Sequence, residues 1–331
     1  MNKILVTGAL GQIGSELVVK LREIYGVDHV VATDLRSSAH EITRSGPFEL
    51  LDVTNDKAMF EIAKRYEVDT IIHLAALLSA TAEEKPLFAW NLNMGGLMNA
   101  LEISRELGCQ LFTPSSIGSF GPTTPKYNTP QDTIQRPNTM YGVNKVSGEL
   151  LCDYYFHKYG LDTRGLRFPG LISYMTPPGG GTTDYAVEIY YAAVTAGRYT
   201  SYIAKDSNMD MMYMPDALDA IIDLMEADSF RLMHRNSFNV TAMSVDPEAI
   251  AAAIREESPG FILDYDVDPK RQAIADSWPH SIDATAAKTE WGFHARYDLK
   301  AMTKDMLSKL SERQCKNTNE SASRGGWALP G

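Results

Sequence analysis

Tyr141 and Lys145 are the residues whose types and spacing point most directly to chemistry. Side chains four residues apart on a helix lie on one face, so this pair can act together. A free tyrosine has a pKa near ~10 and is a poor base at neutral pH unless a cation such as a lysine ammonium stabilises the phenolate. The YxxxK pattern is short, however, and it also occurs in amphipathic helices whose lysine only reaches for solvent.

Ser116 places a hydroxyl group just after the strand-like segment 110–114. A hydroxyl at a strand end can exchange a hydrogen bond with a substrate oxygen, which suits it to work beside a tyrosine and lysine pair. The competing explanation is a residue that only caps the strand end. We predict Ser116, Tyr141 and Lys145 as the catalytic residues.

A glycine-rich segment follows the first strand-like run, where a helical pattern begins. Glycines make a tight turn and let the backbone N–H groups of a helix N-terminus approach a pyrophosphate. A GxxGxxG pattern alone is weak evidence, but a strand before it and a helix after it supply the required context. The predicted cofactor contacts in this loop are Gly8, Gly11, Gln12, Ile13 and Gly14.

Asp34 ends the second strand-like segment, 20 residues after Gly14. A carboxylate at this position can accept hydrogen bonds from the adenosine ribose hydroxyls. It would repel a 2′-phosphate, so NAD is favoured over NADP, although Arg36 leaves the phosphorylated cofactor open. Leu35, between these two residues, is predicted to border the same ribose.

Two further strand ends are predicted to border the cofactor. Asp52 and Val53 follow the third strand and would lie beside the adenine, whereas Leu74, Ala75 and Ala76 follow the fourth strand. Ligands of open α/β sheets bind outside the carboxyl ends of the strands. Small residues there allow the cofactor to approach closely, although a packing role would also explain them.

Short β-branched segments alternate with helical patterns through the first half of the chain. This alternation is typical of the α/β class, and we predict a Rossmann-type, doubly wound parallel sheet. Ile13, Leu17, Leu21 and Ile24 recur at helical spacing and predict the first crossover helix. The predicted strands are 3–7, 29–33, 48–51, 70–74, 110–114 and 163–168.

The pattern changes after Phe168, and a smaller C-terminal α/β substrate domain is predicted over 171–315, after an NAD-binding domain at 1–170. Segment 208–240 is expected to return to the first domain. The Pro- and Gly-rich loop 177–181 is expected to cover the site, and the polar segment 316–331 to form a tail outside the fold. The predicted helices of this half are 184–196, 215–227, 247–257 and 299–310.

The composition argues against several classes of function. Of the 331 residues 44% are hydrophobic, yet no apolar run is long enough to cross a bilayer. A net charge of -11 disfavours nucleic acid or an anionic membrane as partner, so a small-molecule substrate is expected. The seven histidines show no HxxxH or HExxH spacing, and no metal site is predicted. A strand-like run at residue 3 leaves no room for a leader, which indicates a cytoplasmic protein.

The glycine loop, Asp34, Ser116, Tyr141 and Lys145, in this order and with these intervals, resemble the extended short-chain dehydrogenase/reductase family. Further family-like segments are HLAA at 73–76, SSIGSFG at 115–121 and LRFPG at 166–170. The resemblance covers most of the chain and implies NAD-dependent hydride transfer at a hydroxyl or carbonyl carbon. It implies that Ser116 orients the substrate oxygen, that Tyr141 is the general acid and base, and that Lys145 tunes the tyrosine.

Within that family the chain resembles the short-chain type of L-threonine 3-dehydrogenase. Four runs carry this resemblance: PSSIGSFGP at 114–122, RFPGLIS at 167–173, GGTTDYA at 180–186 and DSWP at 276–279. Many members have threonine where this chain has Ser116, a change that preserves the hydroxyl. The resemblance implies oxidation of L-threonine at C3 to 2-amino-3-oxobutyrate.

The same resemblance implies that Leu171 lies near the nicotinamide and that Ser79, Thr183 and Trp278 shape the substrate pocket. Each of the last three also has a purely structural explanation. Thr183 could cap the helix that follows it, Ser79 could be an ordinary loop residue, and Trp278 could fill the core between domains.

Two other functions remain open from the sequence. A nucleotide-sugar epimerase or dehydratase of the same family has to bind a diphosphate, yet Arg198 and Arg271 are the nearest arginines after Phe168. A non-catalytic NAD-sensing regulator would have no reason to keep the three predicted catalytic residues together.

The helix that carries Tyr141 has an apolar opposite side. Family members commonly dimerise through this helix and the one before it, so a homodimer is expected, with burial inside the monomer as the alternative. The apolar residues on that side are Val146, Leu150, Leu151 and Tyr154.

Overall fold

The computed structural model describes residues 1–38, 40–177 and 181–324, with side chains described as far as residue 315. Six parallel strands form the main sheet in the order β3-β2-β1-β4-β5-β7. This order confirms the predicted Rossmann fold, and each of the first five predicted strands agrees with an observed one to within two residues. The strands are β1 (Ile4–Thr7), β2 (Val30–Asp34), β3 (Phe48–Leu50), β4 (Thr70–His73), β5 (Gln110–Phe112) and β7 (Thr163–Arg164).

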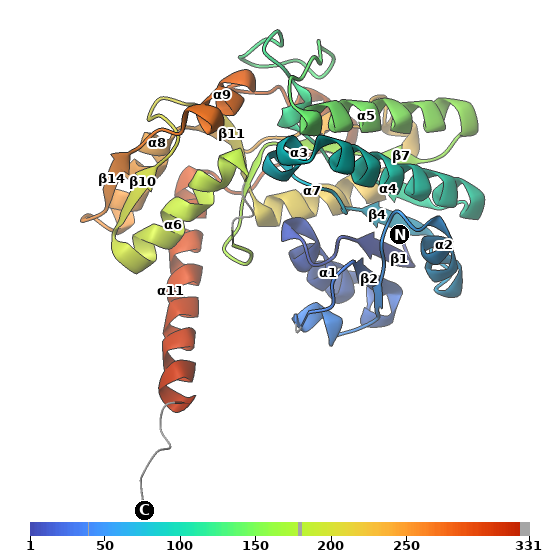
Figure 1. Ribbon diagram of the computed structural model, residues 1–331, viewed down its shortest axis with the longest axis horizontal. Helices are drawn as coiled ribbons and strands as arrows, with labels where there is room; N and C mark the ends of the chain where they lie inside the picture. The colour runs from blue at the N-terminus through green and yellow to red at the C-terminus, as the bar shows by residue number, and fades with distance from the viewer. Residues whose placement is uncertain (39, 178–180, 325–331) are drawn as a thin grey trace, which may run out of the picture.

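Alternating side chains of the central strands bury both faces of this sheet. Ile4 and Val6 of β1 belong to one core cluster, and Leu5 between them belongs to another, because successive strand residues point to opposite faces. Helices α2, α4 and α5 cover the face of Leu5, whereas α1 and α7 pack together on the other face (Figure 1). These helices are α1 (Gln12–Tyr25), α2 (Asp56–Arg65), α4 (Pro86–Leu107), α5 (Met140–Tyr159) and α7 (Met214–Glu226).

The predicted strand 163–168 is wrong as a single element, because the chain leaves the main sheet at Gly165. The N–H of Gly165 donates to Arg235 O (3.3 Å), and its carbonyl accepts from Phe238 N (3.0 Å). These bonds draw the next residues into a separate sheet of order β12-β8-β6, which carries Ser116 at its edge strand. Its strands are β6 (Ser115–Ser116), β8 (Leu166–Phe168) and β12 (Phe238–Asn239).

The second half of the chain builds further sheets and a core of its own. Strands β9 (Gly170–Ile172), β11 (Met209–Tyr213) and β13 (Met243–Val245) form one sheet, with β11 central. Strands β10 (Arg198–Ser201) and β14 (Ile262–Tyr265) form another. The sequence patterns identified none of these five strands. The accompanying helices are α6 (Tyr185–Ala196), α8 (Pro247–Glu257), α9 (Pro269–Ser277), α10 (Thr285–Trp291) and α11 (Leu299–Arg324).

Helix α11 corrects the prediction for the end of the chain. The predicted helix ended at residue 310, and a tail was expected from residue 316, but α11 continues to Arg324 (Figure 1). The extension contains several good helix formers and no proline or glycine, and its sequence is largely polar, so it shows no hydrophobic periodicity. Residues 325–331 of the predicted tail lie outside the described residues.

Short helices complete the described elements. Helix α3 (Ser79–Glu84) follows β4, and the 3-10 helices are η1 (Val27–His29), η2 (Glu41–Thr43), η3 (Ile117–Ser119), η4 (Thr182–Asp184) and η5 (Ser229–Arg231). None of the helices within the described ranges has the length and apolarity needed to span a membrane.

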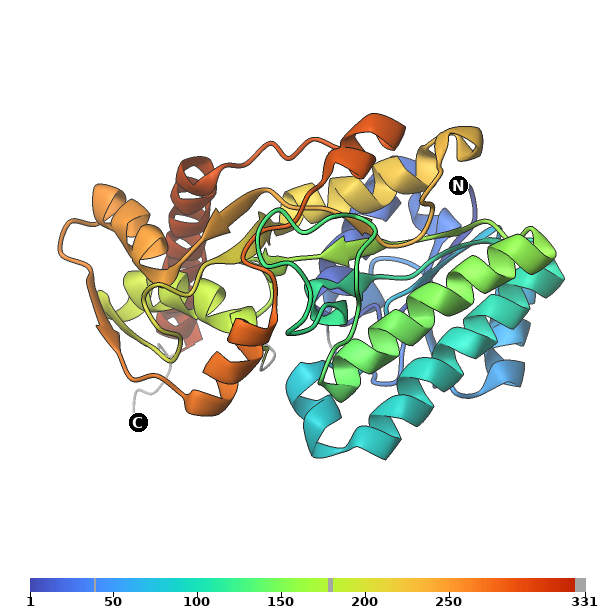
Figure 2. The same cartoon turned by 90° about the horizontal axis from the view of Figure 1, so that it is seen from above.

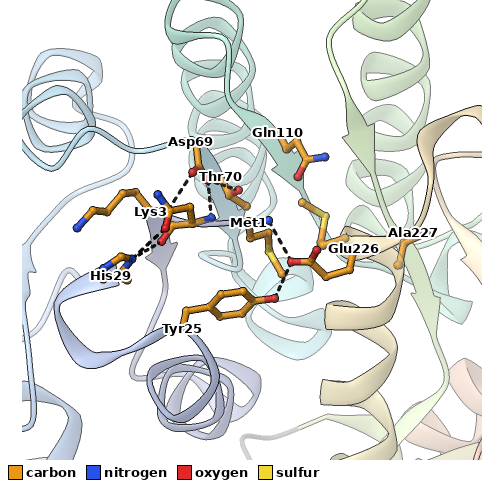
Figure 3. A network of polar contacts seen from close by, with 12 residues as sticks. Met1, Lys3, Tyr25, His29, Asp69, Thr70, Gln110, Glu226 and Ala227 are labelled. Carbon is orange, nitrogen blue, oxygen red and sulfur yellow. Dashed lines mark hydrogen bonds and ion pairs between the residues drawn. The ribbon is translucent and has the colours of Figure 1, made fainter.

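A polar network fastens the amino ends of the central strands, at the edge opposite the strand ends discussed below (Figure 3). The Asp69 carboxylate accepts from Lys3 N (3.0 Å) and from Thr70 Oγ1 (2.7 Å), which joins the starts of β1 and β4. Glu226 at the end of α7 accepts from the Met1 amino group (3.0 Å) and from the Tyr25 hydroxyl (2.7 Å). The network fixes α1 and α7 to the sheet without using any predicted site residue.

Candidate active site

The loop between β1 and α1 is built to hold an anion. Gly8 has a φ of 67°, and a Cβ atom there would lie 2.8 Å from the backbone of Ala75. Gly11 precedes α1, and no side chain in the described part of the chain caps that end, so the N–H groups of the first turn have no side-chain acceptor there. No acidic residue stands in the first turn, so the positive end of the helix dipole faces the loop without a competing charge.

Asp34 is held rigidly at the end of β2. Its carboxylate accepts from Leu10 N (3.0 Å) and Arg36 N (3.1 Å), and the Arg36 Nε lies 3.3 Å away. The carboxylate is buried, whereas the arginine is largely exposed. The position is therefore suited to accept hydrogen bonds from a ribose, with one cation beside it.

A cavity of about 240 Å³ lies against these strand ends. Its lining includes every residue that was predicted to border the adenosine of the cofactor. It also includes Leu51, Leu77 and Leu92, which the sequence analysis did not identify. Leu92 lies in α4, where its sequence position gives no signal of a ligand. The residues that line it are Gly8, Gly11, Asp34, Leu35, Arg36, Leu51, Asp52, Val53, Leu74, Ala75, Ala76, Leu77 and Leu92.

Asn93 of α4 fixes the loop after β4, a role that the sequence analysis missed. Its amide accepts from Leu77 N (2.8 Å) and donates to Leu77 O (3.3 Å) and to Asn144 Oδ1 (3.0 Å). Because Asn144 lies in α5 beside Lys145, this buried bridge ties the cofactor loop to the helix that carries the predicted catalytic pair.

Helix α5 places Tyr141 in its first turn. Thr139 caps the helix by accepting from Gly142 N (3.1 Å), and Glu83 of α3 accepts from Met140 N. A Cβ atom at position 142 would lie 2.3 Å from the carbonyl oxygen of Gly118, so only glycine allows the helix to approach η3 this closely. The start of α5 is thereby docked on the segment that follows Ser116.

The three predicted catalytic residues converge beside this contact. The Lys145 ammonium lies 5.3 Å from the centroid of the Tyr141 ring and donates to Pro114 O (2.7 Å). Ser116 Oγ accepts from Gly118 N (3.1 Å) and so caps η3, which was the structural alternative for this residue. That bond uses the oxygen as acceptor and leaves the hydroxyl proton available for donation to a substrate oxygen.

A second cavity, of about 230 Å³, joins the first through shared lining residues Gly8, Gly11, Leu74 and Ala76. It brings the predicted catalytic residues together with Leu171 and with all three predicted pocket residues. Lining residues that the sequence analysis missed include Phe168, Pro169, Thr182 and Asp184. All four lie inside the runs RFPGLIS and GGTTDYA, so those runs could have identified them. The predicted residues that line it are Gly8, Gly11, Gln12, Ile13, Gly14, Leu74, Ala76, Ser79, Ser116, Tyr141, Lys145, Leu171, Thr183 and Trp278.

Each predicted pocket residue lines the cavity and also belongs to a defined helix or to the second core. Ser79 is buried and begins α3, so it is not a loop residue. Thr183 lies within η4 and does not cap α6 through its side chain. Trp278 packs in the second core, and its carbonyl accepts from Lys126 Nζ (3.0 Å). Of the predicted covering loop, Gly181 lines the cavity, and residues 178–180 lie outside the described residues.

His73, at the end of β4, is neutral at physiological pH. Burial, together with the positive charge of Lys145, lowers the pKa of His73 to about 4. Its Nδ1 lies 2.9 Å from the Thr7 hydroxyl. This histidine therefore adds no positive charge beside Lys145.

Comparisons with known proteins identify the family to which this architecture belongs. The sequence profile of the NAD dependent epimerase/dehydratase family matches residues 4–240. An uncharacterized epimerase/dehydratase of Staphylococcus saprophyticus is 62% identical over 315 residues, which cover 95% of this chain and 98% of that protein.

Solved structures are similar to this chain in both sequence and fold. The L-threonine dehydrogenase from Clostridium difficile is 65% identical with a TM-score of 0.94, covering 95% of this chain and 98% of that one. The holo form of a GalE-like L-threonine dehydrogenase from Cupriavidus necator is 48% identical with a TM-score of 0.91, covering 93% of this chain and 99% of that one.

The first cavity fits NAD on its own geometry. The uncapped N-terminus of α1 suits a pyrophosphate, and the fixed carboxylate of Asp34 suits a ribose. These features and the matched relatives confirm the predicted NAD cofactor and the resemblance to extended short-chain dehydrogenases/reductases. The chain is an enzyme that belongs to the NAD-dependent epimerase/dehydratase family.

Proposed function

We propose that this enzyme is an L-threonine 3-dehydrogenase, which oxidises the C3 hydroxyl of L-threonine to give 2-amino-3-oxobutyrate. The observation that carries the proposal is the second cavity, where Ser116, Tyr141 and Lys145 meet Ser79, Thr183 and Trp278 around about 230 Å³. The similarity to solved L-threonine dehydrogenases at 65% and 48% identity supports the same substrate.

The charges of the second cavity favour a small amino acid over a nucleotide sugar. Among the described residues that line it, Lys145 is the single cation. Arg198 pairs with Asp264 (2.8 Å), and the Arg271 guanidinium lies over the Tyr202 ring (4.2 Å), so neither arginine lines the cavity. A diphosphate is usually bound through arginine or several backbone donors, and this wall offers no arginine for it.

The chain's own residues account for the proton chemistry of the proposed reaction. Tyr141 acts as a phenolate, which the ammonium of Lys145 stabilises, and it becomes a neutral phenol when it takes the proton of the C3 hydroxyl. Ser116 donates its hydroxyl proton to the same substrate oxygen and holds it toward the tyrosine. NAD, when bound, supplies the acceptor for the hydride that leaves C3. Trp278 and Thr183 border the substrate and limit the water around it.

Absorbance of NADH tests the proposal directly. The purified enzyme is mixed with NAD and either L-threonine or a panel of nucleotide sugars, with Tyr141→Phe as the matched control. We expect the wild-type enzyme to form NADH from L-threonine and the Tyr141→Phe variant to form none. Conversion of a nucleotide sugar, with no NADH formed from threonine, would instead assign the enzyme to the epimerase and dehydratase side of its family.

A further inference from the structure

Three consecutive residues face three successive turns of α5. Lys145 donates to Pro114 O (2.7 Å), and the Ser115 hydroxyl donates to the carboxylate of Glu149. Ser116 and Tyr141 line the same cavity. Positions 141, 145 and 149 repeat every four residues and so lie along one side of the helix. Segment 114–116 therefore lies against this side of α5.

Glu149 is the most heavily bonded member of this arrangement. In addition to the Ser115 hydroxyl, its carboxylate accepts from Arg167 Nε (3.0 Å), Arg167 Nη2 (2.8 Å) and Gln135 Nε2 (2.7 Å). Glu149 is 6% exposed and Arg167 7%. A buried carboxylate is stable only when it is paired and hydrogen-bonded, and a bidentate arginine also fixes its orientation.

Arg167 extends the network to a third part of the fold. It belongs to β8, and its Nη1 donates to Gln131 O (2.7 Å) and Asn239 Oδ1 (3.2 Å). The second cavity borders Phe168 and Pro169, which follow it directly. The buried pair thus connects α5, the small sheet β12-β8-β6 and one wall of the substrate cavity.

The contacts of Glu149 hold the backbone on both sides of Ser116. On the near side it binds Ser115, and since neighbouring strand residues point to opposite faces, fixing one side chain orients the other. On the far side Gln135, which donates to Glu149, also reaches Ser119 Oγ (3.2 Å) at the end of η3. Glu149, Gln135 and Ser119 are not among the residues that line the cavity in which Ser116 and Tyr141 would meet a substrate, whereas Ser115 lies on its wall beside Ser116.

We propose that Glu149, with Arg167 as its counterion, is a positioning residue that sets Ser116 against Tyr141 through the hydroxyl of Ser115. The proposal rests on the proposed function of Ser116 and Tyr141. A small misplacement of a catalytic group lowers the rate of the chemical step while leaving cofactor binding intact. Loss of the Ser115 hydroxyl should therefore lower kcat and leave the KM for NAD unchanged.

A double-mutant cycle on the full-length enzyme tests this coupling. Ser115→Ala is expected to lower kcat by about tenfold, and Ser116→Ala by about a hundredfold, with the KM for NAD within about twofold in both. In the Ser116→Ala background, Ser115→Ala should change kcat by less than about twofold, because the group through which it acts is gone. Ser201→Ala, which removes another buried hydroxyl bond at a residue that does not line the cavity, is the control expected to keep full kcat.

The outcomes separate this proposal from the function on which it rests. Multiplied losses in the double variant would overturn the positioning role, because Ser115 would then act independently of Ser116. Full activity of Ser116→Ala would instead remove the catalytic role proposed for that serine. Glu149→Gln supplies a second test, since an amide cannot accept the bidentate arginine pair; an unchanged kcat in this variant would also overturn the positioning role.

Discussion

The Lys145 ammonium lies 5.3 Å from the Tyr141 ring centroid and is anchored by the Pro114 carbonyl at 2.7 Å. The anchor holds the lysine next to the phenol through a neutral carbonyl and not through an acidic partner. The same carbonyl belongs to the segment that carries Ser116. The end of the strand therefore carries Ser116 and also holds the Lys145 side chain, whereas helix α5 positions Tyr141.

Replacement of Tyr141 by phenylalanine should lower kcat for L-threonine by about 10² to 10⁴-fold, because the general base is lost while the ring remains. NAD affinity, measured by calorimetric titration, should stay within about twofold of the wild type. Tyr159→Phe at the exposed end of α5 is the matched control and should keep full activity. Retention of turnover in the Tyr141 variant would contradict the assignment of this residue as the base.

Asp34 should determine the choice of cofactor, because its carboxylate stands where a 2′-phosphate would have to lie. Asp34→Asn is expected to raise the KM for NAD by about tenfold and to allow measurable turnover with NADP. Arg36, released from the carboxylate, would then pair with the phosphate. Adding Arg36→Ala to the Asp34 variant should abolish the NADP reaction. Steady-state kinetics with both cofactors measure the ratio of NADP to NAD turnover. An unchanged KM for NAD in Asp34→Asn, with no turnover of NADP, would contradict this role.

The cofactor loop and the YxxxK pair could be located from the sequence because their signals are local. A glycine loop between a strand and a helix, and two residues one helical turn apart, take their geometry from nearest neighbours along the chain. The structure places all of these residues on the walls of two adjoining cavities. Their chemical roles remain predictions that the variants above test.

The contacts that hold the site together could not be predicted in the same way. Asn93 meets Leu77 and Asn144, and Glu149 meets Ser115 and Arg167, across 16 to 51 residues of chain. Nothing in the local pattern marks such partners. The break at Gly165 is hidden for a similar reason, since the bonds that divert the strand come from residues about 70 positions later.

Thr183 should contribute to binding of L-threonine more than to binding of NAD. Its methyl side packs against Gly170, where an added Cβ would lie 3.0 Å from it, and this contact fixes the side chain on the cavity wall. Thr183→Val keeps the shape and removes the hydroxyl, so we expect the KM for L-threonine to rise about tenfold. Thr183→Ser keeps the hydroxyl and should stay close to the wild type. Equal KM values in all three proteins would leave Thr183 a structural residue only.

The outer faces of α4 and α5, which run side by side, predict a homodimer (Figure 2). Leu150 is 62% exposed and Leu87 79%, and a groove beside Trp90 and Leu151 lies between the two helices. Exposed apolar side chains on both helices favour an interaction surface, and a twofold axis would bury both copies of it. Leu150→Glu should convert the dimer to a monomer in analytical ultracentrifugation. Phe230→Glu, at a fully exposed site elsewhere, should remain dimeric; a monomeric wild type would contradict the prediction.

Glu16 should make stability depend on pH in the opposite sense to an ordinary surface carboxylate. Burial raises the pKa of Glu16 from 4.5 to about 7, against the lowering effects of its hydrogen bond from Ser173 and of Arg313. Between pH 4.5 and 7 the folded state therefore holds a proton that the unfolded chain has already lost. The stability that this proton provides is present below pH 4.5 and is lost as the pH rises through 7.

Glu16→Gln, which keeps the shape without the charge, removes this dependence. The variant should have nearly the wild-type free energy of unfolding at pH 4.5 and exceed it by about 3 kcal/mol at pH 8, as urea titrations at both values would measure. Glu23→Gln, an exposed glutamate on the same helix, is the control and should show no such change. A stability difference between Glu16→Gln and the wild type that is equal at the two pH values would mean that Glu16 keeps its charge in the folded protein throughout this range.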